Sequence, residues 1–254
     1  MEQQVSKIKK NICRKVHQNG LQSLVVREFR PVDKEEVQRI YCEGFMEMIP
    51  DTAFRGLRHH PERLLLYAAM TVLCFVITMC WWVIALLPAI VLGCRYFYSR
   101  RVFHGYLEQV MSKDMGDIER FYSKSPDSCL WVAVLEGKVV GLVAAVGQQR
   151  PRRAVELQRM SVDRRYRRYG VAFELGLKVQ DFAAAHGYST VVLGTIAYTP
   201  APHRLYQSLG YCCVGVTNGY ATPGAGMSLM ERLFYKVRHH SYSLDVQNNK
   251  LSQH

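Results

Sequence analysis

The stretch from Val155 to Ala172 constrains the fold more than any other part of this chain. Val155 to Val162 is rich in β-branched and long apolar side chains and predicts a strand. A basic turn, Asp163 to Tyr169, and Gly170 follow, and apolar residues then recur at helical spacing from Val171 to Ala185. A strand, a basic turn and a helix in this order leave unpaired N–H groups at a helix N-terminus, which favours phosphate binding.

The turn has the residue types that a pyrophosphate site needs. Its centre follows the pattern Arg/Gln-x-x-Gly-x-Gly/Ala, filled by Arg167, Gly170 and Ala172. Small residues at the last two positions let a pyrophosphate approach the backbone, and Arg167 and Arg168 add positive charge. The pattern is short, however, and an arginine-rich turn can equally be a solvated surface loop.

The segments after the helix favour the pyrophosphate interpretation. A second strand is predicted at Ser189 to Leu193, followed by a short helix containing Leu205 to Leu209 and then by Gly210-Tyr211. In this order the segments resemble the acetyl-CoA half of the GNAT N-acetyltransferase superfamily, whose pyrophosphate loop is followed by an LY…LGF/Y segment. The resemblance implies an α+β architecture, the GNAT fold with a mixed central sheet flanked by helices, and acetyl-CoA as cosubstrate without a metal.

The resemblance also implies roles for individual residues. The pantetheine arm would pair with the backbone of the central strand, and the pyrophosphate would lie in the turn. The cofactor-binding residues are then Met160, Ser161, Val162, Arg167, Arg168, Tyr169, Gly170, Val171 and Ala172. Glu156 would be the general base, directly or through a water, or else an ordinary strand carboxylate paired with Arg159. Tyr206 would protonate the CoA thiolate, the alternative being a packing role.

Two positions depart from the superfamily pattern. The loop typically reads Arg-Gly-x-Gly, whereas this chain has Arg168 at the place of the first glycine. Pro202 stands where the following helix usually has alanine; Pro200 and Pro202 are compatible with a first helical turn that Thr199 would cap. These departures leave two alternatives open: an enzyme with a shifted amine substrate, and a membrane-tethered binding module with an impaired CoA site.

The acceptor is suggested by longer segments. VREFRPVDKEEVQRIY, HRLYQSLGY and others between Val26 and His240 are similar to the aspartate N-acetyltransferases of the superfamily. That similarity implies L-aspartate as acceptor, with cysteine S-conjugates or protein lysines as alternatives. A dicarboxylate needs cations near the amine, so Arg159, Arg55 and Arg58 are predicted substrate-binding residues. Arg55 and Arg58 could instead lie at lipid headgroups.

The run from Leu64 to Cys94 has a different character, with 31 consecutive residues that carry no formal charge. About 20 residues cross a bilayer as one helix, so the run is too long for one upright span and too short for two. Arginines flank both ends, which suits both flanks on the cytosolic side. Pro88 and Trp81-Trp82 favour a re-entrant hairpin; a single tilted span and a buried core helix are the alternatives.

The rest of the chain completes this organisation. We expect a flexible basic N-terminus (1–20), a GNAT domain (21–240) interrupted by the membrane insertion (64–94) between its first two helices, and a polar tail (241–254). Further predicted elements are a strand at Leu24–Phe29, a helix from Lys34 to about Ile49-Pro50, a short helix at Val102–Met111, a hairpin of Leu130–Leu135 with Val139–Val146, and a closing hairpin of Cys212–Val216 with Met227–Val237.

Composition limits the partners and the compartment. The 254-residue chain has a net charge of +12, which favours anionic partners such as a phosphorylated cosubstrate, a small acid or anionic lipid. Its eight cysteines form no CxxC pair, which argues against a zinc site or a disulfide framework. The arginine-rich stretch lacks interleaved aromatics, so nucleic acid is not expected. The resemblance implies the endoplasmic reticulum membrane with a cytosol-facing catalytic domain, or else mitochondria or the cytoplasm.

Overall fold

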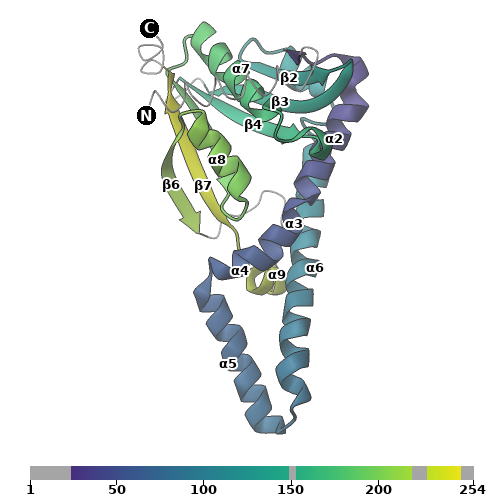
Figure 1. Ribbon diagram of the computed structural model, residues 1–254, viewed down its shortest axis with the longest axis vertical. Coiled ribbons are helices and arrows are strands. Elements are labelled where there is room, and N and C mark those ends of the chain that lie inside the picture. Colours follow the sequence, from purple (N-terminus) through teal and green to yellow (C-terminus); the bar gives the residue numbers. More distant parts are fainter. Residues whose placement is uncertain (1–23, 149–152, 219–227, 247–254) are drawn as a thin grey trace.

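The computed structural model describes residues 24–148, 153–218 and 228–246, which form a seven-stranded sheet with helices on both faces (Figure 1). The strand order is β1-β2-β3-β4-β5-β7-β6. The strands are β1 (Val25–Glu28), β2 (Ser128–Leu135), β3 (Lys138–Gln148), β4 (Ala154–Val162), β5 (Thr190–Ile196), β6 (Cys212–Asn218) and β7 (Arg238–Asp245). Strands β4 and β5 pair in parallel, and the other neighbours pair antiparallel.

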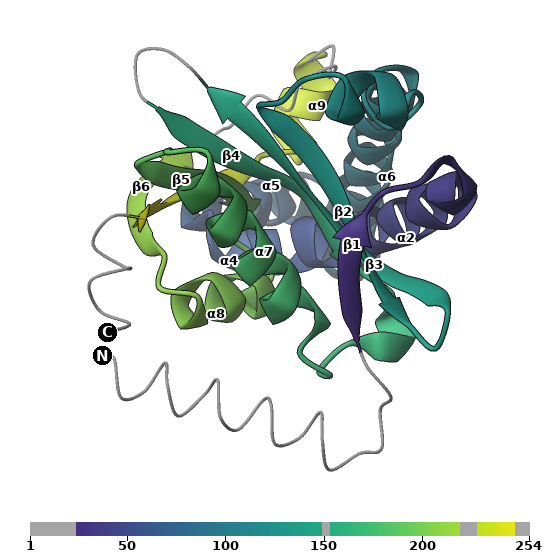
Figure 2. The same cartoon turned by 90° about the horizontal axis from the view of Figure 1, so that it is seen from above.

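The helices divide between the two faces of the sheet, as Figure 2 shows from above. They are α2 (Lys34–Met46), α3 (Met48–Pro50), α4 (Gly56–Arg58), α5 (Pro61–Thr78), α6 (Trp82–Ser112), α7 (Val171–Ala185), α8 (Pro200–Ser208) and α9 (Leu229–Phe234). Helix α2 and the second half of α6 cover one face, where they enclose one apolar cluster with β2 and β3. Helices α7 and α8 cover the other face.

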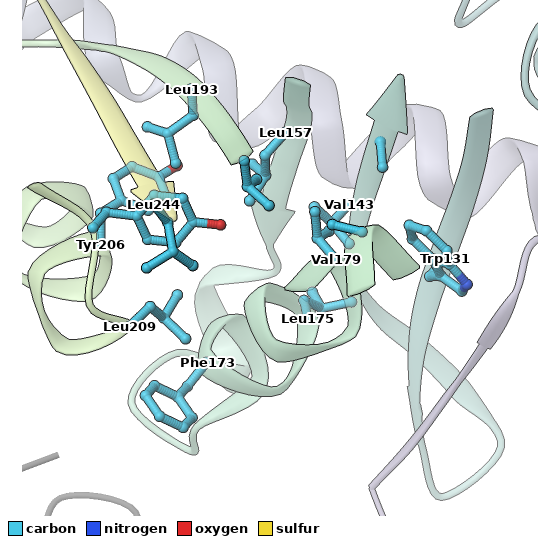
Figure 3. Close-up of a cluster of buried hydrophobic side chains, with 14 of the residues drawn as sticks. Trp131, Val143, Leu157, Phe173, Leu175, Val179, Leu193, Tyr206, Leu209 and Leu244 are labelled. Carbon is cyan, nitrogen blue, oxygen red and sulfur yellow. The ribbon is translucent and has the colours of Figure 1, made fainter. Parts of the chain in front are cut away.

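The largest core lies under α7 (Figure 3). Leu175 and Val179, four residues apart on α7, are fully buried against Val143 of β3 and Leu157 of β4. The apolar side chains that recur at helical spacing on α7 therefore pack in one layer with the alternate side chains of the strands. This layer holds the N-terminus of α7 against the end of β4, which is where the basic turn connects them.

The central predictions are confirmed. The strand expected at Val155 to Val162 is β4, the helix expected at Val171 to Ala185 is α7, and the mixed sheet flanked by helices is present. The hairpin around Glu136-Gly137 is formed by β2 and β3, and both turn residues have positive φ (51° and 77°).

The helix predicted to stop near Pro50 continues. Helix α2 ends at Met46, but α3, a π-helical turn (Asp51–Arg55) and α4 carry the chain on as helix to Arg58. The prediction was wrong because a proline inside a helix removes only one backbone hydrogen bond, the one to the carbonyl four residues earlier. The wider π turn directly after Pro50 accommodates such a local break in the ladder.

The end of the domain also differs from expectation. Strand β6 is present, but Met227–Val237 contains the helix α9, which begins with a capping box between Ser228 and Glu231. The partner of β6 is β7, which includes residues assigned to the polar tail from 241 onward. Tyr242 and Leu244 alternate with serines there and are buried in the main core, which ties this segment into the sheet. The predicted N-terminal segment 1–20 lies outside the described residues.

The apolar run forms a helical hairpin that projects from the domain (Figure 1). Helices α5 and α6 are long and apolar enough to cross a membrane, by length and composition only. Met79, with φ of 48°, turns the chain between them. The helix predicted at Val102 to Met111 is the C-terminal part of α6. Most large apolar side chains of the hairpin face outward, including Val72, Leu73, Ile77, Trp81 and Trp82.

Candidate active site

Strands β4 and β5 separate in the middle of the sheet. Their pairing covers only Ala154–Glu156 against Thr190–Val192, after which β5 continues alongside β7 alone. A bulge in β4 sets Arg159 and Met160 opposite a single residue of β3, and Arg159 takes a positive φ of 55°. Beyond Glu156, the edge of β4 that faces β5 therefore has no strand partner among the described residues. Met160 to Val162, predicted to bind pantetheine, lie on this edge.

Asp163 orders the turn that follows β4. Its buried carboxylate accepts a hydrogen bond from the Arg165 backbone N–H (2.9 Å) and forms ion pairs with Arg165 (2.7 Å) and with Arg39 of α2 (2.8 Å). The hydrogen bonds from Arg165 and then Arg39 hold the pKa of Asp163 well below its usual range, against the effect of burial. Asp163 therefore fixes the start of the basic turn, while most of its arginines are exposed to solvent.

The turn ends with two left-handed residues. Arg168 has a φ of 69° and Gly170, at the N-cap of α7, has a φ of 84°. The first N–H groups of α7, at Val171 and Ala172, have no partner within the helix and point out of its N-terminus. Arg168 thus adopts, with a side chain, the conformation for which glycine is suited. The loop geometry is kept although one glycine of the superfamily pattern is missing.

Replacing Arg168 with glycine should stabilise the fold by about 1 kcal/mol, because a residue with a Cβ loses about that much in the left-handed region. Chemical denaturation of both proteins in the same detergent measures the change. Arg164→Gly is a matched control, since Arg164 belongs to the same turn, in a 3-10 helix, without a positive φ. Lower stability of Arg168→Gly would show that the arginine is not strained.

Arg167 and the cavity beside the turn connect it to α2. The Arg167 guanidinium donates to the Val162 carbonyl (3.1 Å) and forms a half-exposed ion pair with Glu47 (2.6 Å). An open cavity of about 680 Å³ lies between α2 and the turn, lined by Arg39, Glu43, Met46, Glu47, Asp163, Arg164 and Arg165. The predicted phosphate-binding arginine is therefore beside the helix N-terminus but currently holds a carboxylate.

Glu156 lies where the two strands part. Its half-buried carboxylate accepts a hydrogen bond from Gln148 Nε2 (3.0 Å), and Glu156 stands opposite Val192 in the last rung between β4 and β5. Glu156 and Gln158 are two residues apart on β4, and each pairs directly with a residue of β3. Their side chains therefore lie on the same face of the sheet. The alternative partner, Arg159, is engaged elsewhere. Glu156 is thus positioned next to the unpaired edge of β4.

Arg159 is part of a polar cluster beneath α2 and α6. Its guanidinium forms an ion pair with Asp114 (2.7 Å) and donates to the hydroxyls of Tyr41 (3.0 Å) and Tyr106 (2.8 Å). Asp114 also accepts from the Tyr122 hydroxyl (2.5 Å), and both charged side chains are mostly buried. Protein groups thus occupy most of the Arg159 donors that were predicted to bind the substrate.

Tyr206 lies on the opposite face, on α8. Its ring is buried in the main core beside Leu193, Leu209 and Leu244 (Figure 3). Burial, and secondarily the neighbouring Tyr242, raises the pKa of Tyr206 to about 12, so the phenol keeps its proton at neutral pH. No hydrogen bond of its hydroxyl is found within the described part of the chain, and the residue is only 7% exposed. Thr199 is the N-cap residue of α8, as predicted, but its side chain makes no capping bond.

Arg55 and Arg58 lie apart from Arg159. Arg55 follows a π-helical path and is paired with Asp51 (3.2 Å), while Arg58 ends α4. Both side chains are exposed. Among the described residues, no ion pair or hydrogen bond joins either one to the Arg159 cluster.

His239 is a candidate site residue that sequence reasoning missed. The residue pairs between β4 and β5, and between β5 and β7, place His239 on the same face of the sheet as Glu156. Its ring lies over the exposed Gly194, where a Cβ would collide with the imidazole. Burial lowers the pKa of His239, so it is neutral near pH 7. The alternating pattern of β7 could have indicated this orientation, had β7 been recognised as a strand.

A family model described as the acetyltransferase (GNAT) family matches residues 93–211, which include the unpaired edge of β4, the basic turn and Tyr206. A human protein named N-acetylaspartate synthetase is 50% identical over 89% of this chain and 75% of its own length. The chain belongs to the GNAT acetyltransferase family. It is therefore an acetyl-CoA-dependent N-acetyltransferase, as the sequence resemblance implied.

Other relatives are consistent with this membership. The N-acetylaspartate synthetase of Xenopus tropicalis is 48% identical over 89% of this chain and 83% of its own length. Human N-acetyltransferase 8B is 31% identical over 73% of this chain and 83% of its own length. Among solved structures, an N-acetyltransferase from Staphylococcus aureus superposes with a TM-score of 0.52 at 16% identity, over 89% of this chain and 99% of that one. The last similarity concerns the fold alone.

Proposed function

We propose that this protein transfers acetyl from acetyl-CoA to the amino group of L-aspartate, giving N-acetyl-L-aspartate and CoA. The observation that carries the proposal is the 50% identity with human N-acetylaspartate synthetase over most of the chain. In the reaction the amine nitrogen forms a bond to the acetyl carbon and the thioester C–S bond breaks. The ammonium loses two protons, of which one is released and the other ends on the CoA thiol. The chain must therefore bind two anionic substrates, accept a proton and protonate a thiolate.

The described residues suit each of these tasks. The unpaired edge of β4 from Met160 to Val162 can pair with the amide groups of pantetheine, in the manner of a missing strand. The helix N-terminus at Gly170 to Ala172 and the guanidinium groups beside it suit the pyrophosphate. Binding there requires Arg167 to exchange Glu47 for a phosphate or to bind both.

We assign the proton transfers to two residues on opposite faces of the sheet. Glu156 accepts the ammonium proton, directly or through a water, from an amine that approaches on the α2–α6 face. Tyr206 donates its proton to the thiolate from the other face. The separated strands β4 and β5 lie between them, so a thioester inserted at this point would be reached from both sides.

For the acceptor carboxylates, Arg55 and Arg58 remain predicted ligands, since both are exposed near the end of β5. We assign Arg159 a different role from the one that the sequence suggested. With Asp114, it fixes the left-handed residue that bends β4 away from β5. Arg159 would thus act as a positioning residue for the site, and its clamp role is the weaker alternative.

We further propose that the α5–α6 hairpin anchors the enzyme in a membrane without crossing it. The apolar part of α5, from Leu64 to Thr78, is about 22 Å long, which is less than the hydrocarbon thickness of about 30 Å. Both ends of the hairpin return to the same domain, so both flanks lie on one side. A re-entrant hairpin fits these facts better than a tilted span. The cytosolic face of the endoplasmic reticulum, or of mitochondria, is the compartment that we propose.

The acceptor is tested with a panel of amines and detergent-purified protein. L-aspartate, a cysteine S-conjugate and a lysine peptide are each supplied with acetyl-CoA, and thiol release is followed with mass detection of the product. We expect turnover with L-aspartate and little with the others. Turnover with a cysteine conjugate or lysine would replace the proposed acceptor. CoA binding without thiol release for any amine would favour the tethered binding module.

A further inference from the structure

Arg95 is a buried cation without a carboxylate partner. It is one of the arginines that flank the apolar run, which were expected on the cytosolic side, yet it is only 2% exposed. Its Nε donates to the carbonyl of Ala53 in the π turn (2.9 Å). Within the described residues, this is the one hydrogen bond found for its guanidinium, and no ion pair links it to an acid. The other N–H groups of the fork are thus unused by the described residues.

Two buried hydroxyls, one on α6 and one in the π turn that Arg95 contacts, are also unsatisfied among the described residues. Ser99 lies one turn farther along the same face of α6 and is 1% exposed, and Thr52 precedes Ala53 and is 2% exposed. Neither hydroxyl has a hydrogen-bond partner among the described residues. Burying a charge and two polar groups without partners is costly, and native proteins rarely do so unless a ligand or water completes the set.

Tyr198 links the surroundings of Arg95 to the end of β5. Arg95 lies near Tyr198, at the end of β5. Burial raises the pKa of Tyr198, and the positive charge of Arg95 partly counters this rise. The backbone N–H of Arg238 donates to the Tyr198 hydroxyl, which donates to the Lys236 carbonyl, whereas the Arg238 side chain bonds Asn218. The acid in this group, Glu62, is already paired with Lys236 (3.0 Å).

This position adjoins the proposed acceptor side of the sheet. Tyr198 follows β5 only four residues after Gly194, the exposed position beneath the His239 ring. The π turn packs against α6 at this level. Tyr198 packs here in one apolar cluster with Ile49 of α3 and Phe103 of α6, so this level of α6 contacts the end of β5.

We propose that Arg95, with Thr52 and Ser99, is the binding site for a carboxylate of the acceptor. A guanidinium fork binds a carboxylate through two parallel hydrogen bonds, and hydroxyls can donate to its remaining lone pairs. This inference rests on the proposed function, because it identifies where a small dicarboxylate is held. The competing explanation is structural: Arg95 serves only to satisfy the Ala53 carbonyl that the π turn leaves open.

The two explanations predict different behaviour of Arg95→Met. If Arg95 is kept for a ligand, removing its buried charge leaves the ligand-free protein as stable as before or more stable. The KM for L-aspartate should rise about 100-fold, with the KM for acetyl-CoA unchanged. Arg95→Lys should show a smaller rise, since the charge remains but the fork is lost. Arg100→Met is the matched control, because Arg100 is exposed on the same helix and, among the described residues, bonds only His104 (3.3 Å).

A binding measurement separates this inference from the proposed function. Thermal unfolding of detergent-purified protein is followed with succinate, with inorganic phosphate and with CoA, and in nanodiscs with and without anionic lipid. We expect succinate to raise the Tm of wild type and Arg100→Met but not of Arg95→Met, while CoA stabilises all three. A succinate shift that persists in Arg95→Met, a shift from anionic lipid alone, or a lower Tm of ligand-free Arg95→Met would overturn the inference. None of these results depends on whether L-aspartate is the amine that reacts.

Discussion

Arg159→Met is expected to lower the free energy of unfolding by about 3–5 kcal/mol, because it leaves the buried Asp114 carboxylate without its cation. Tyr122 would be the remaining hydrogen-bond donor to Asp114 among the described contacts. Denaturant unfolding in detergent, followed by a far-ultraviolet signal, measures the loss. Activity should fall for aspartate and acetyl-CoA alike, because the bulge of β4 shapes the whole site.

A double-mutant cycle provides the control for this prediction. Asp114→Asn alone should also destabilise, whereas the combination with Arg159→Met should cost less than the sum of the two. Coupling of this kind identifies the ion pair as the source of the effect. A stable Arg159→Met protein with a raised KM for L-aspartate and normal acetyl-CoA binding would instead support the substrate-clamp role that the sequence suggested.

Tyr206→Phe is expected to reduce kcat by about 100- to 1000-fold, because the change removes the proton donor to the thiolate. The ring stays in the core, so stability and the KM for acetyl-CoA should change little. Steady-state kinetics with thiol detection measure the effect. Tyr211→Phe is a close control, since the ring of Tyr211 lies 5.9 Å from that of Tyr206 and also belongs to the core.

The pH dependence of the wild type adds a second check. Because burial raises the pKa of Tyr206 to about 12, the phenol stays protonated well above the ordinary tyrosine range. The general-acid step should therefore show no loss of kcat between about pH 9 and pH 10.5, where an unperturbed tyrosine would ionise. Equal activity of Tyr206→Phe and wild type would remove Tyr206 from the chemistry and leave it a packing residue.

Local sequence patterns were sufficient to predict an element when the residues of that element alone determine its conformation. The two-residue period of β4 and the helical period of α7 are visible in the chain, and both appear where they were predicted. The basic turn between them was predicted from residue type, and it has the expected helix N-terminus. Its missing glycine was also noticed, but only the structure shows that Arg168 takes the left-handed conformation itself.

Patterns failed where distant segments compete for the same role. Met227–Val237 is apolar enough for a strand, yet a capping box makes part of it α9, and the less apolar Arg238–Asp245 fills the place between β5 and β6. Strand propensity cannot decide this, because a strand is stabilised mainly by the neighbours that it packs against. The orientation of His239 toward Gly194 was missed for the same reason.

The sequence by itself determined the family, the order of the central elements and an apolar insertion flanked by arginines. These properties are local or cumulative along the chain, so no contact information is needed to see them. Only the tertiary structure decided the partners of the charged residues: Arg159 pairs with Asp114, Arg167 with Glu47, and Arg95 with no acid in the described residues. The physical reason is that the energy of a charge depends on its burial and its nearest counter-charge, and residues far apart in sequence supply both.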